Sequence, residues 1–192
     1  MKIVFATNNL NKLSEIRSLV PDGVEILSLK EINCLEELPE TNPTIEENAL
    51  QKAKYVYEKT GLDCFADDTG LEIEALDGRP GVYSARYAGP DCDSEANIKK
   101  VLKELKSHKN RKAQFKTVIA LIIDGKKYFF DGKVEGGILK QKQGIDGFGY
   151  DSIFRPFGCD QSFAEMSLEL KNKISHRGLA VDKLIKFLKN KF

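Results

Sequence analysis

The sequence predicts an α/β fold built around a mixed sheet that includes a long hairpin. Strand-like and helix-like patterns follow one another from end to end of the 192 residues, which is typical of the α/β class. Two β-rich runs, 113–123 and 127–134, flank Asp124-Gly125, a dipeptide that favours a tight hairpin turn. Hairpin strands pair antiparallel, so the sheet is not purely parallel. A chain of this length forms one domain, or two lobes that share one core.

Short runs bounded by polar residues predict the remaining strands. The first run is uniformly apolar, as expected for a buried strand, whereas the last alternates apolar and acidic residues, as in a half-exposed strand. The runs are 2–6, 24–29, 63–66 and 71–76.

Apolar residues at helical spacing predict the helices. The first helix spans 10–20. The second begins at Thr44 and Glu47, which form a capping-box pattern, and Gly61 closes it. Serine hydroxyls commonly satisfy the first backbone N–H groups of a helix.

The later helices follow the same reasoning. Ser94 is predicted to cap the third helix and Ser175 to cap the last one. The stretches 77–81 and 144–149 are rich in glycine and polar residues and are expected to form turns or loops.

The composition narrows the function classes. The chain carries 30 Lys+Arg against 29 Asp+Glu, a net charge of +1, so a general electrostatic nucleic-acid binder is not expected. The longest apolar run, 118–123, is too short to span a bilayer, and the first residues turn polar too early for a signal peptide. We therefore expect a cytoplasmic protein with no nucleic-acid partner and no membrane partner.

Cysteine and histidine usage limits the metal chemistry. The four cysteines are scattered without a C-x-x-C pair, and the chain has only two histidines. A disulfide framework, a zinc site and a histidine-rich site are therefore not expected. Any metal is expected on carboxylates, which favour hard ions such as magnesium or manganese.

The first candidate site joins the first strand to the first helix. A strand-to-helix turn directs backbone N–H groups and the positive end of the helix dipole outward, which suits a phosphate, and Lys12 adds a full charge. The glycines of a Walker loop are missing. The alternative is an ordinary asparagine cap with a solvated lysine. The residues are Thr7, Asn8, Asn9, Leu10, Asn11 and Lys12.

The second candidate site follows the apolar run 63–66. Asp67 and Asp68 are adjacent acids that we expect at a strand end, where a divalent cation would offset their repulsion and the remaining carboxylate could accept a proton from water. The alternative is a solvated acidic turn. Glu40 is a plausible third ligand, and by pattern alone Lys52 is a solvated helix lysine.

The third and fourth candidate sites lie in the C-terminal third. Glycines flanking Phe148 let the backbone approach a flat ligand while the ring stacks on it; the alternative is a turn with a core aromatic. Lys171, His176 and Arg177 place cations near the start of the last helix, an arrangement that opposes the helix dipole unless an anion or carbonyl faces it.

Together these segments strongly resemble the inosine triphosphate pyrophosphatase family. The resemblance rests on TNNLNK, on FADDTGLEIEALDGRPGVYSARYAG, on GFGYDSIF and on KNKISHR, in the family's order. It departs at Thr69, where the family commonly has serine, and at Ser152, where it commonly has proline.

The resemblance implies a cytoplasmic homodimer that hydrolyses ITP, dITP and XTP to the monophosphate and pyrophosphate with magnesium. It also implies a two-lobed α/β fold around a long mixed sheet, with the nucleotide in a cleft between the lobes. Residues 7–12 and Lys52 would hold the triphosphate. Glu40, Asp67 and Asp68 would hold the metal, with Asp68 also the proton acceptor. The remaining implied contacts, on the substrate, base and sugar, are Thr69, Phe148, Gly149, Tyr150, Asp151, Lys171, His176 and Arg177.

Two other functions compete with this interpretation. A haloacid-dehalogenase-type phosphatase would place its key acids one residue apart, whereas Asp67 and Asp68 are adjacent. A nucleotide-sensing binding module would need the cations but not the acidic pair.

Overall fold

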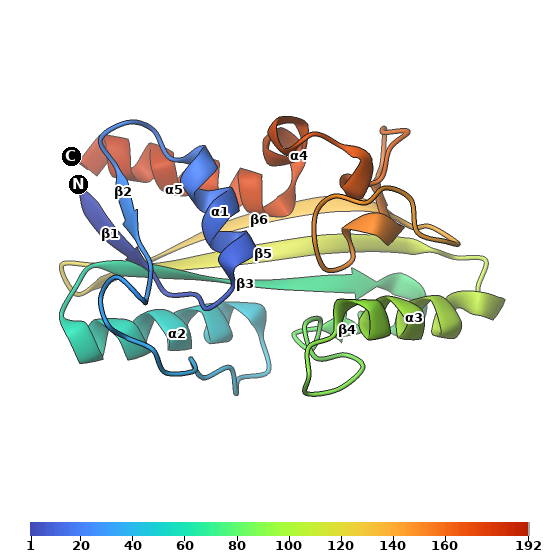
Figure 1. Ribbon diagram of the computed structural model, residues 1–192, viewed down its shortest axis with the longest axis horizontal. Helices are drawn as coiled ribbons and strands as arrows, with labels where there is room; N and C mark the ends of the chain where they lie inside the picture. Colours follow the sequence, from blue (N-terminus) through green and yellow to red (C-terminus); the bar gives the residue numbers. More distant parts are fainter. Residues whose placement is uncertain (192) are drawn as a thin grey trace. The chain divides into compact units, whose positions relative to one another are not determined.

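The computed structural model describes residues 1–191, whose strands form a mixed sheet (Figure 1). The strands run in the order β2-β1-β3-β5-β6-β7, and β4 pairs with β3. Strand β1 is parallel to β2 and β3, whereas the β3–β4 and β6–β7 pairs are antiparallel. The strands are β1 (Lys2–Phe5), β2 (Glu25–Leu27), β3 (Cys64–Ile73), β4 (Pro80–Gly81), β5 (Lys112–Ile123), β6 (Lys126–Ile138) and β7 (Phe154–Pro156).

The chain divides into two compact units, which confirms the predicted two-lobed α/β fold. Unit 1 comprises residues 1–68, 117–132 and the segment from Arg177 onward, and unit 2 comprises residues 69–116 and 133–176. Strands β3, β5 and β6 each contribute residues to both units. The predicted hairpin is confirmed: Asp124 and Gly125 both have positive φ, at 51° and 73°, as a tight hairpin turn requires.

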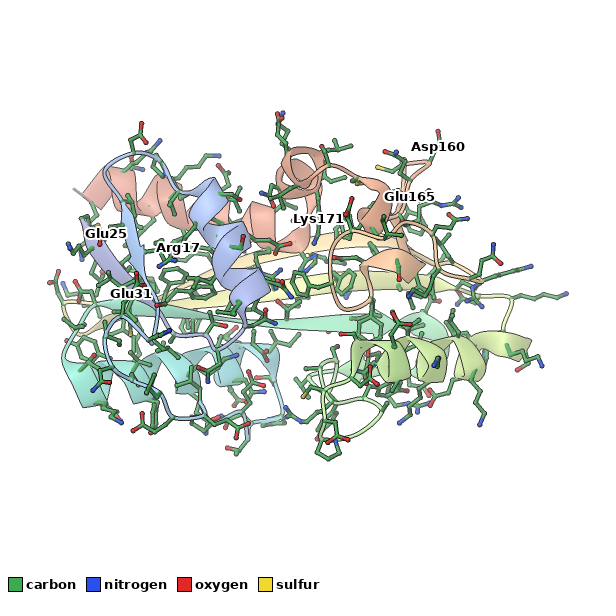
Figure 2. All side chains as sticks on the ribbon, in the orientation of Figure 1. Arg17, Glu25, Glu31, Asp160, Glu165 and Lys171 are labelled. Carbon is green, nitrogen blue, oxygen red and sulfur yellow. The ribbon has the colours of Figure 1, made fainter. Side chains whose placement is uncertain are left out.

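In unit 1, helices cover both faces of the sheet (Figure 1). Helices α1 (Leu10–Leu19) and α5 (His176–Lys191) pack on one face, and α2 (Ile45–Thr60) packs on the other. The cap residues of α2 are as predicted: the Thr44 side chain accepts from the Glu47 N–H, and Gly61 ends the helix with φ of 69°. On α1, Arg17 donates to Glu31, a pair labelled in Figure 2.

The residues of β3 alternate between these two faces, since successive strand side chains point to opposite sides. Phe65 stacks on Phe5, 4.6 Å between ring centroids, in the cluster formed with α1 and α5. Its neighbours Cys64 and Ala66 belong to the cluster formed with α2. The same alternation decides where the two acids that follow point.

Unit 2 has its own core. Helix α3 (Ser94–Glu104) and the short helix α4 (Leu168–Ile174) belong to it, together with single helical turns. Its buried cluster combines residues of β3, α3 and β5 with aromatic residues of the C-terminal third, among them Tyr150, Phe154 and Phe163.

Several predicted boundaries were wrong. The acids Asp67 and Asp68 do not follow a strand: β3 continues through them to Ile73, and 74–76 is a helical turn rather than a strand. Asp93, not Ser94, caps α3 through its carboxylate. The sequence pattern did not predict α4, which ends at Ser175; α5 begins at the next residue, directly after the serine predicted to cap the last helix. No helix among residues 1–191 is long and apolar enough to cross a membrane.

Candidate functional site

The strand-to-helix turn at residues 7–12 is built by its own polar side chains. Asn9 caps α1, and its Oδ1 accepts hydrogen bonds from the N–H groups of Asn11 and Lys12 at 3.0 and 3.1 Å. The Asn9 N–H donates to Thr7 Oγ1. The asparagine cap of the alternative interpretation is therefore present, but its solvated lysine is not, because Lys12 Nζ lies 3.0 Å from an oxygen of buried Asp67.

Asp67 points to the face covered by α1 and α5, where two cations hold it. Lys12 donates to Oδ1, and Arg177 Nε donates to Oδ2 at 3.1 Å. The Asp67 side chain is fully buried. Burial by itself would raise the pKa of Asp67, but the positive charges of Lys12, Arg177 and Lys52 outweigh it and hold the pKa below its usual range. Asp67 is therefore a charged carboxylate at neutral pH.

Arg177 carries a second carboxylate, that of Glu15. Arg177 Nη1 donates to Glu15 Oε2 at 2.5 Å, and both side chains are buried. The cations at the start of the last helix are predicted to face an anion or carbonyl-rich ligand; for Arg177, two carboxylates of the protein itself serve as that anion. The sequence pattern does not identify Glu15 as a site residue; its only signal is an acidic residue on the buried face of the first helix.

Asp68 points to the opposite face, toward α2. Lys52 Nζ lies 3.6 Å from Asp68 Oδ1 and also donates to Glu40. Burial raises the pKa of Asp68, and the neighbouring carboxylates of Glu40 and Asp67 add to this, while Lys52 and Lys12 oppose it. A carboxyl with a raised pKa is a better proton acceptor than an ordinary surface aspartate.

Side chains of α2 hold the segment that carries Glu40. Asn48 is fully buried; it accepts from the Asn42 N–H and donates to the Asn42 carbonyl, at 2.8 and 3.1 Å. Gln51 accepts from the Thr41 N–H at 3.0 Å. With Lys52 on the same helix, these contacts place Glu40 beside Asp68, although it lies far from Asp68 in the sequence.

These seven side chains form what we call the ionic cluster: Lys12, Glu15, Glu40, Lys52, Asp67, Asp68 and Arg177. It contains four carboxylates against three cations, so one negative charge is left over. All its members belong to unit 1. Hard carboxylate oxygens with an uncompensated charge suit a divalent cation of the magnesium type. Among residues 1–191, no three His, Cys, Asp or Glu side chains form a ready-made metal group.

Unit 2 contains the second set of predicted site residues, in residues 147–151, which we call the glycine loop. Asp151 Oδ2 accepts from the Phe148 N–H and from Lys171 Nζ, both at 2.8 Å. Lys171, labelled in Figure 2, comes from α4, and its Nζ lies 4.9 Å from the centre of the Phe148 ring. The structure thus brings together Phe148 and Asp151 of one sequence motif and Lys171 of another.

His176 and Thr69 also belong to unit 2. The His176 ring is 3% exposed and stacks on Phe115, 4.5 Å between centroids. Thr69 follows Asp68 within β3 and is half-buried. Their predicted contacts with the base and the substrate stay predictions.

Gly147 in the glycine loop lies close to the Asp151 carboxylate, which gives a stability prediction. Its φ is 77°, and a Cβ there would collide with the Asp151 carboxylate. We expect Gly147→Ala to lower the free energy of unfolding by about 1–3 kcal/mol, the cost of a strained backbone, plus the cost of displacing Asp151. Chemical denaturation measures this. Gly158→Ala is the matched control, because Gly158 has φ of 78° and open space around it. Equal losses for the two variants would contradict the tight approach to Asp151.

Fold and site define a two-unit α/β protein in which one buried strand carries acids on both faces, each held by cations from different helices. The sequence matches the Ham1 family over residues 3–187. The chain belongs to the Ham1 family.

Relatives cover nearly the whole chain. It is 57% identical over 188 residues to a dITP/XTP pyrophosphatase of Flavobacterium johnsoniae, covering 98% of each chain. It is 46% identical over 189 residues to the dITP/XTP pyrophosphatase of Bacillus subtilis, covering 96% of each. Among solved structures, the Staphylococcus aureus Ham1 protein is similar with a TM-score of 0.90, at 39% identity and full coverage of both chains. The predicted family resemblance is confirmed.

Proposed function

We propose that this protein is a hydrolase that cleaves the triphosphates of deaminated purines, ITP, dITP and XTP, into the monophosphate and pyrophosphate. Such an enzyme cleanses the nucleotide pool. The names of the relatives support the substrate class. The observation that carries the proposal is the ionic cluster, because β3 brings a strongly ionised acid and a raised-pKa acid together with two lysines.

The two acids of β3 have different tasks. Asp67, whose pKa is lowered by its cations, remains charged and keeps Lys12 and Arg177 in place. Asp68, whose pKa is raised, accepts the proton of the water that attacks the α-phosphorus. Lys12 and Lys52 lie against these acids and, with residues 7–11, bind the triphosphate oxygens. This division depends on the two acids pointing to opposite faces.

Magnesium is part of the proposal. Glu40 and Asp68, which both lie against Lys52, would hold the ion together with phosphate oxygens of the substrate, since magnesium is commonly bound by one or two carboxylates plus phosphates. Asp67, whose two oxygens accept from Lys12 and Arg177, would contribute its negative charge to the site. When bound, the ion offsets the charge of the phosphates and of the leaving pyrophosphate.

An assay of ITP with and without magnesium tests the function. We expect equal amounts of IMP and pyrophosphate, and negligible turnover after chelation with EDTA. Release of orthophosphate would identify a phosphatase of the competing class, and binding of ITP without any turnover would identify a nucleotide-sensing module. Either result would overturn the proposal.

The lysines of the ionic cluster give a binding prediction. We expect Lys12→Ala and Lys52→Ala each to weaken ITP binding by at least tenfold, because a positive charge facing a polyanion is lost. Inosine, which has no phosphate, should bind them as it binds the wild type. Lys59→Ala, an exposed lysine of α2 paired with Glu36, is the control. Calorimetric titration measures the affinity of the three variants for ITP and for inosine. Equal losses of affinity for the two ligands would place Lys12 and Lys52 away from the phosphates.

We further propose that the protein acts as a cytoplasmic homodimer on a small-molecule purine nucleotide. Light scattering coupled to size exclusion measures the oligomeric state. A mass of one chain across the concentrations used in the assay would refute the dimer while leaving the hydrolase proposal intact.

A further inference from the structure

Ser84 connects three segments of unit 2. Its buried hydroxyl accepts a hydrogen bond from the N–H of Leu71 in β3 at 2.8 Å and donates to the carbonyl of Gly81 at 2.6 Å. Its backbone carbonyl accepts from the hydroxyl of Tyr150 in the glycine loop, also at 2.8 Å. One residue therefore joins strand β3, two residues beyond Thr69, to the glycine loop.

Tyr150 is anchored by this contact. Its side chain is 5% exposed and belongs to the buried cluster of unit 2. Burial raises the pKa of the Tyr150 hydroxyl, so that it remains a neutral donor at neutral pH. Tyr150 stands between Phe148 and Asp151, so its position constrains both the ring and the carboxylate that Lys171 contacts.

Helix α3 holds the segment around Ser84. Asn97, 3% exposed, donates to the Ala85 carbonyl at 2.7 Å and accepts from the Ala88 N–H at 2.6 Å. Lys100 donates to the Tyr87 carbonyl at 2.6 Å. Residues three apart share one face of a helix, so Asn97 and Lys100 grip the same segment. The place of Ser84 is thus set by a helix rather than by a free loop.

We propose that Ser84 is a positioning residue for purine recognition, acting through Tyr150 to hold the glycine loop in place relative to β3. The inference rests on the proposed function, since it takes the purine of ITP as the ligand of the glycine loop. Ser84 itself touches no nucleotide. Its loss affects binding of the base and leaves binding of the phosphates unchanged.

The test compares two tyrosines of the same hydrophobic cluster. Tyr150→Phe removes the hydroxyl that donates to the Ser84 carbonyl. We expect the KM for ITP to rise roughly five- to tenfold, the scale of one hydrogen bond, and kcat to stay within about twofold of the wild type. Affinity for IMP should fall in parallel, and affinity for inorganic tripolyphosphate, which has no base, should not change. Tyr87→Phe is the matched control: it loses a hydrogen bond to Glu104 in the same unit, and its KM should equal that of the wild type.

Ser84→Ala gives the second arm, because it removes the bonds to Leu71 and Gly81 but keeps the carbonyl. We expect the KM for ITP to rise by a similar factor. In the double variant Ser84→Ala/Tyr150→Phe, the KM should rise by less than the product of the two single-variant factors, as expected for coupled residues. An unchanged KM in both single variants, an equal shift in Tyr87→Phe, or a parallel loss of tripolyphosphate affinity would overturn the inference. Failure of the wild type to hydrolyse ITP would instead overturn the proposed function. The IMP and tripolyphosphate titrations would still test whether Ser84 affects binding of the base, because they do not depend on hydrolysis.

Discussion

Asp68→Asn is expected to slow ITP hydrolysis on the order of a hundredfold or more, the usual contribution of a general base. The amide cannot accept the proton of the attacking water, although it keeps the shape of the side chain. Asp68 is buried against Lys52, with a pKa raised chiefly by that burial, so its chemistry differs from that of a surface aspartate. Steady-state kinetics with saturating magnesium measures kcat, and direct titration of ITP checks that the variant still binds.

Asp63→Asn makes the same chemical change just before β3. Asp63 Oδ1 accepts from the N–H of Asp124 in the hairpin turn, a bond that an asparagine oxygen can also accept. We expect this control to retain wild-type turnover. Turnover close to wild type in folded Asp68→Asn would instead assign the proton transfer to another group, with Glu40, also paired with Lys52, as the next to test.

Arg177→Met is expected to lower the free energy of unfolding by about 3–5 kcal/mol, the cost of leaving buried charges without their partner. Asp67 and Glu15 both lose their shared cation, and both carboxylates are buried. Chemical denaturation gives the difference from the wild type. Lys183→Met on the same helix is the control, since its pair with Asp131 is exposed and such pairs contribute at most about 1 kcal/mol. Losses of the same size in the two variants would refute the structural role of Arg177.

Arg177 is also expected to recognise the purine base. The 6-oxo group of hypoxanthine is an acceptor where adenine has an amino donor, so a donor there distinguishes ITP from ATP. If Arg177 supplies that donor, Arg177→Lys, which keeps a positive charge near Asp67, narrows the ratio of kcat/KM between ITP and ATP. An unchanged ratio with lowered turnover would assign Arg177 to the support of Asp67 alone.

Local sequence signals predicted the elements that depend on neighbouring residues. The Asp124-Gly125 hairpin, the start of α2 at Thr44 and its end at Gly61 are all confirmed, because positive φ and cap hydrogen bonds are properties of a few consecutive residues. The predicted end of β3 was wrong, because the true end depends on residues far away in the sequence. From the neighbouring residues alone, Asp67 and Asp68 predict the end of a strand. The strand continues through these buried acids because lysines and an arginine from distant segments neutralise them.

The sequence by itself determined the family, the α/β class and nearly all the chemical groups of the site, since these depend on residue types and their order. The tertiary structure alone decided which charges meet. Lys12 and Asp67 are 55 residues apart, Arg177 and Asp67 are 110 apart, and Arg177 and Glu15 are 162 apart. No local pattern encodes such pairs, because they form only when the alternation of β3 turns Asp67 toward α1 and α5 and Asp68 toward α2. That alternation gives two adjacent, chemically identical side chains a lowered and a raised pKa.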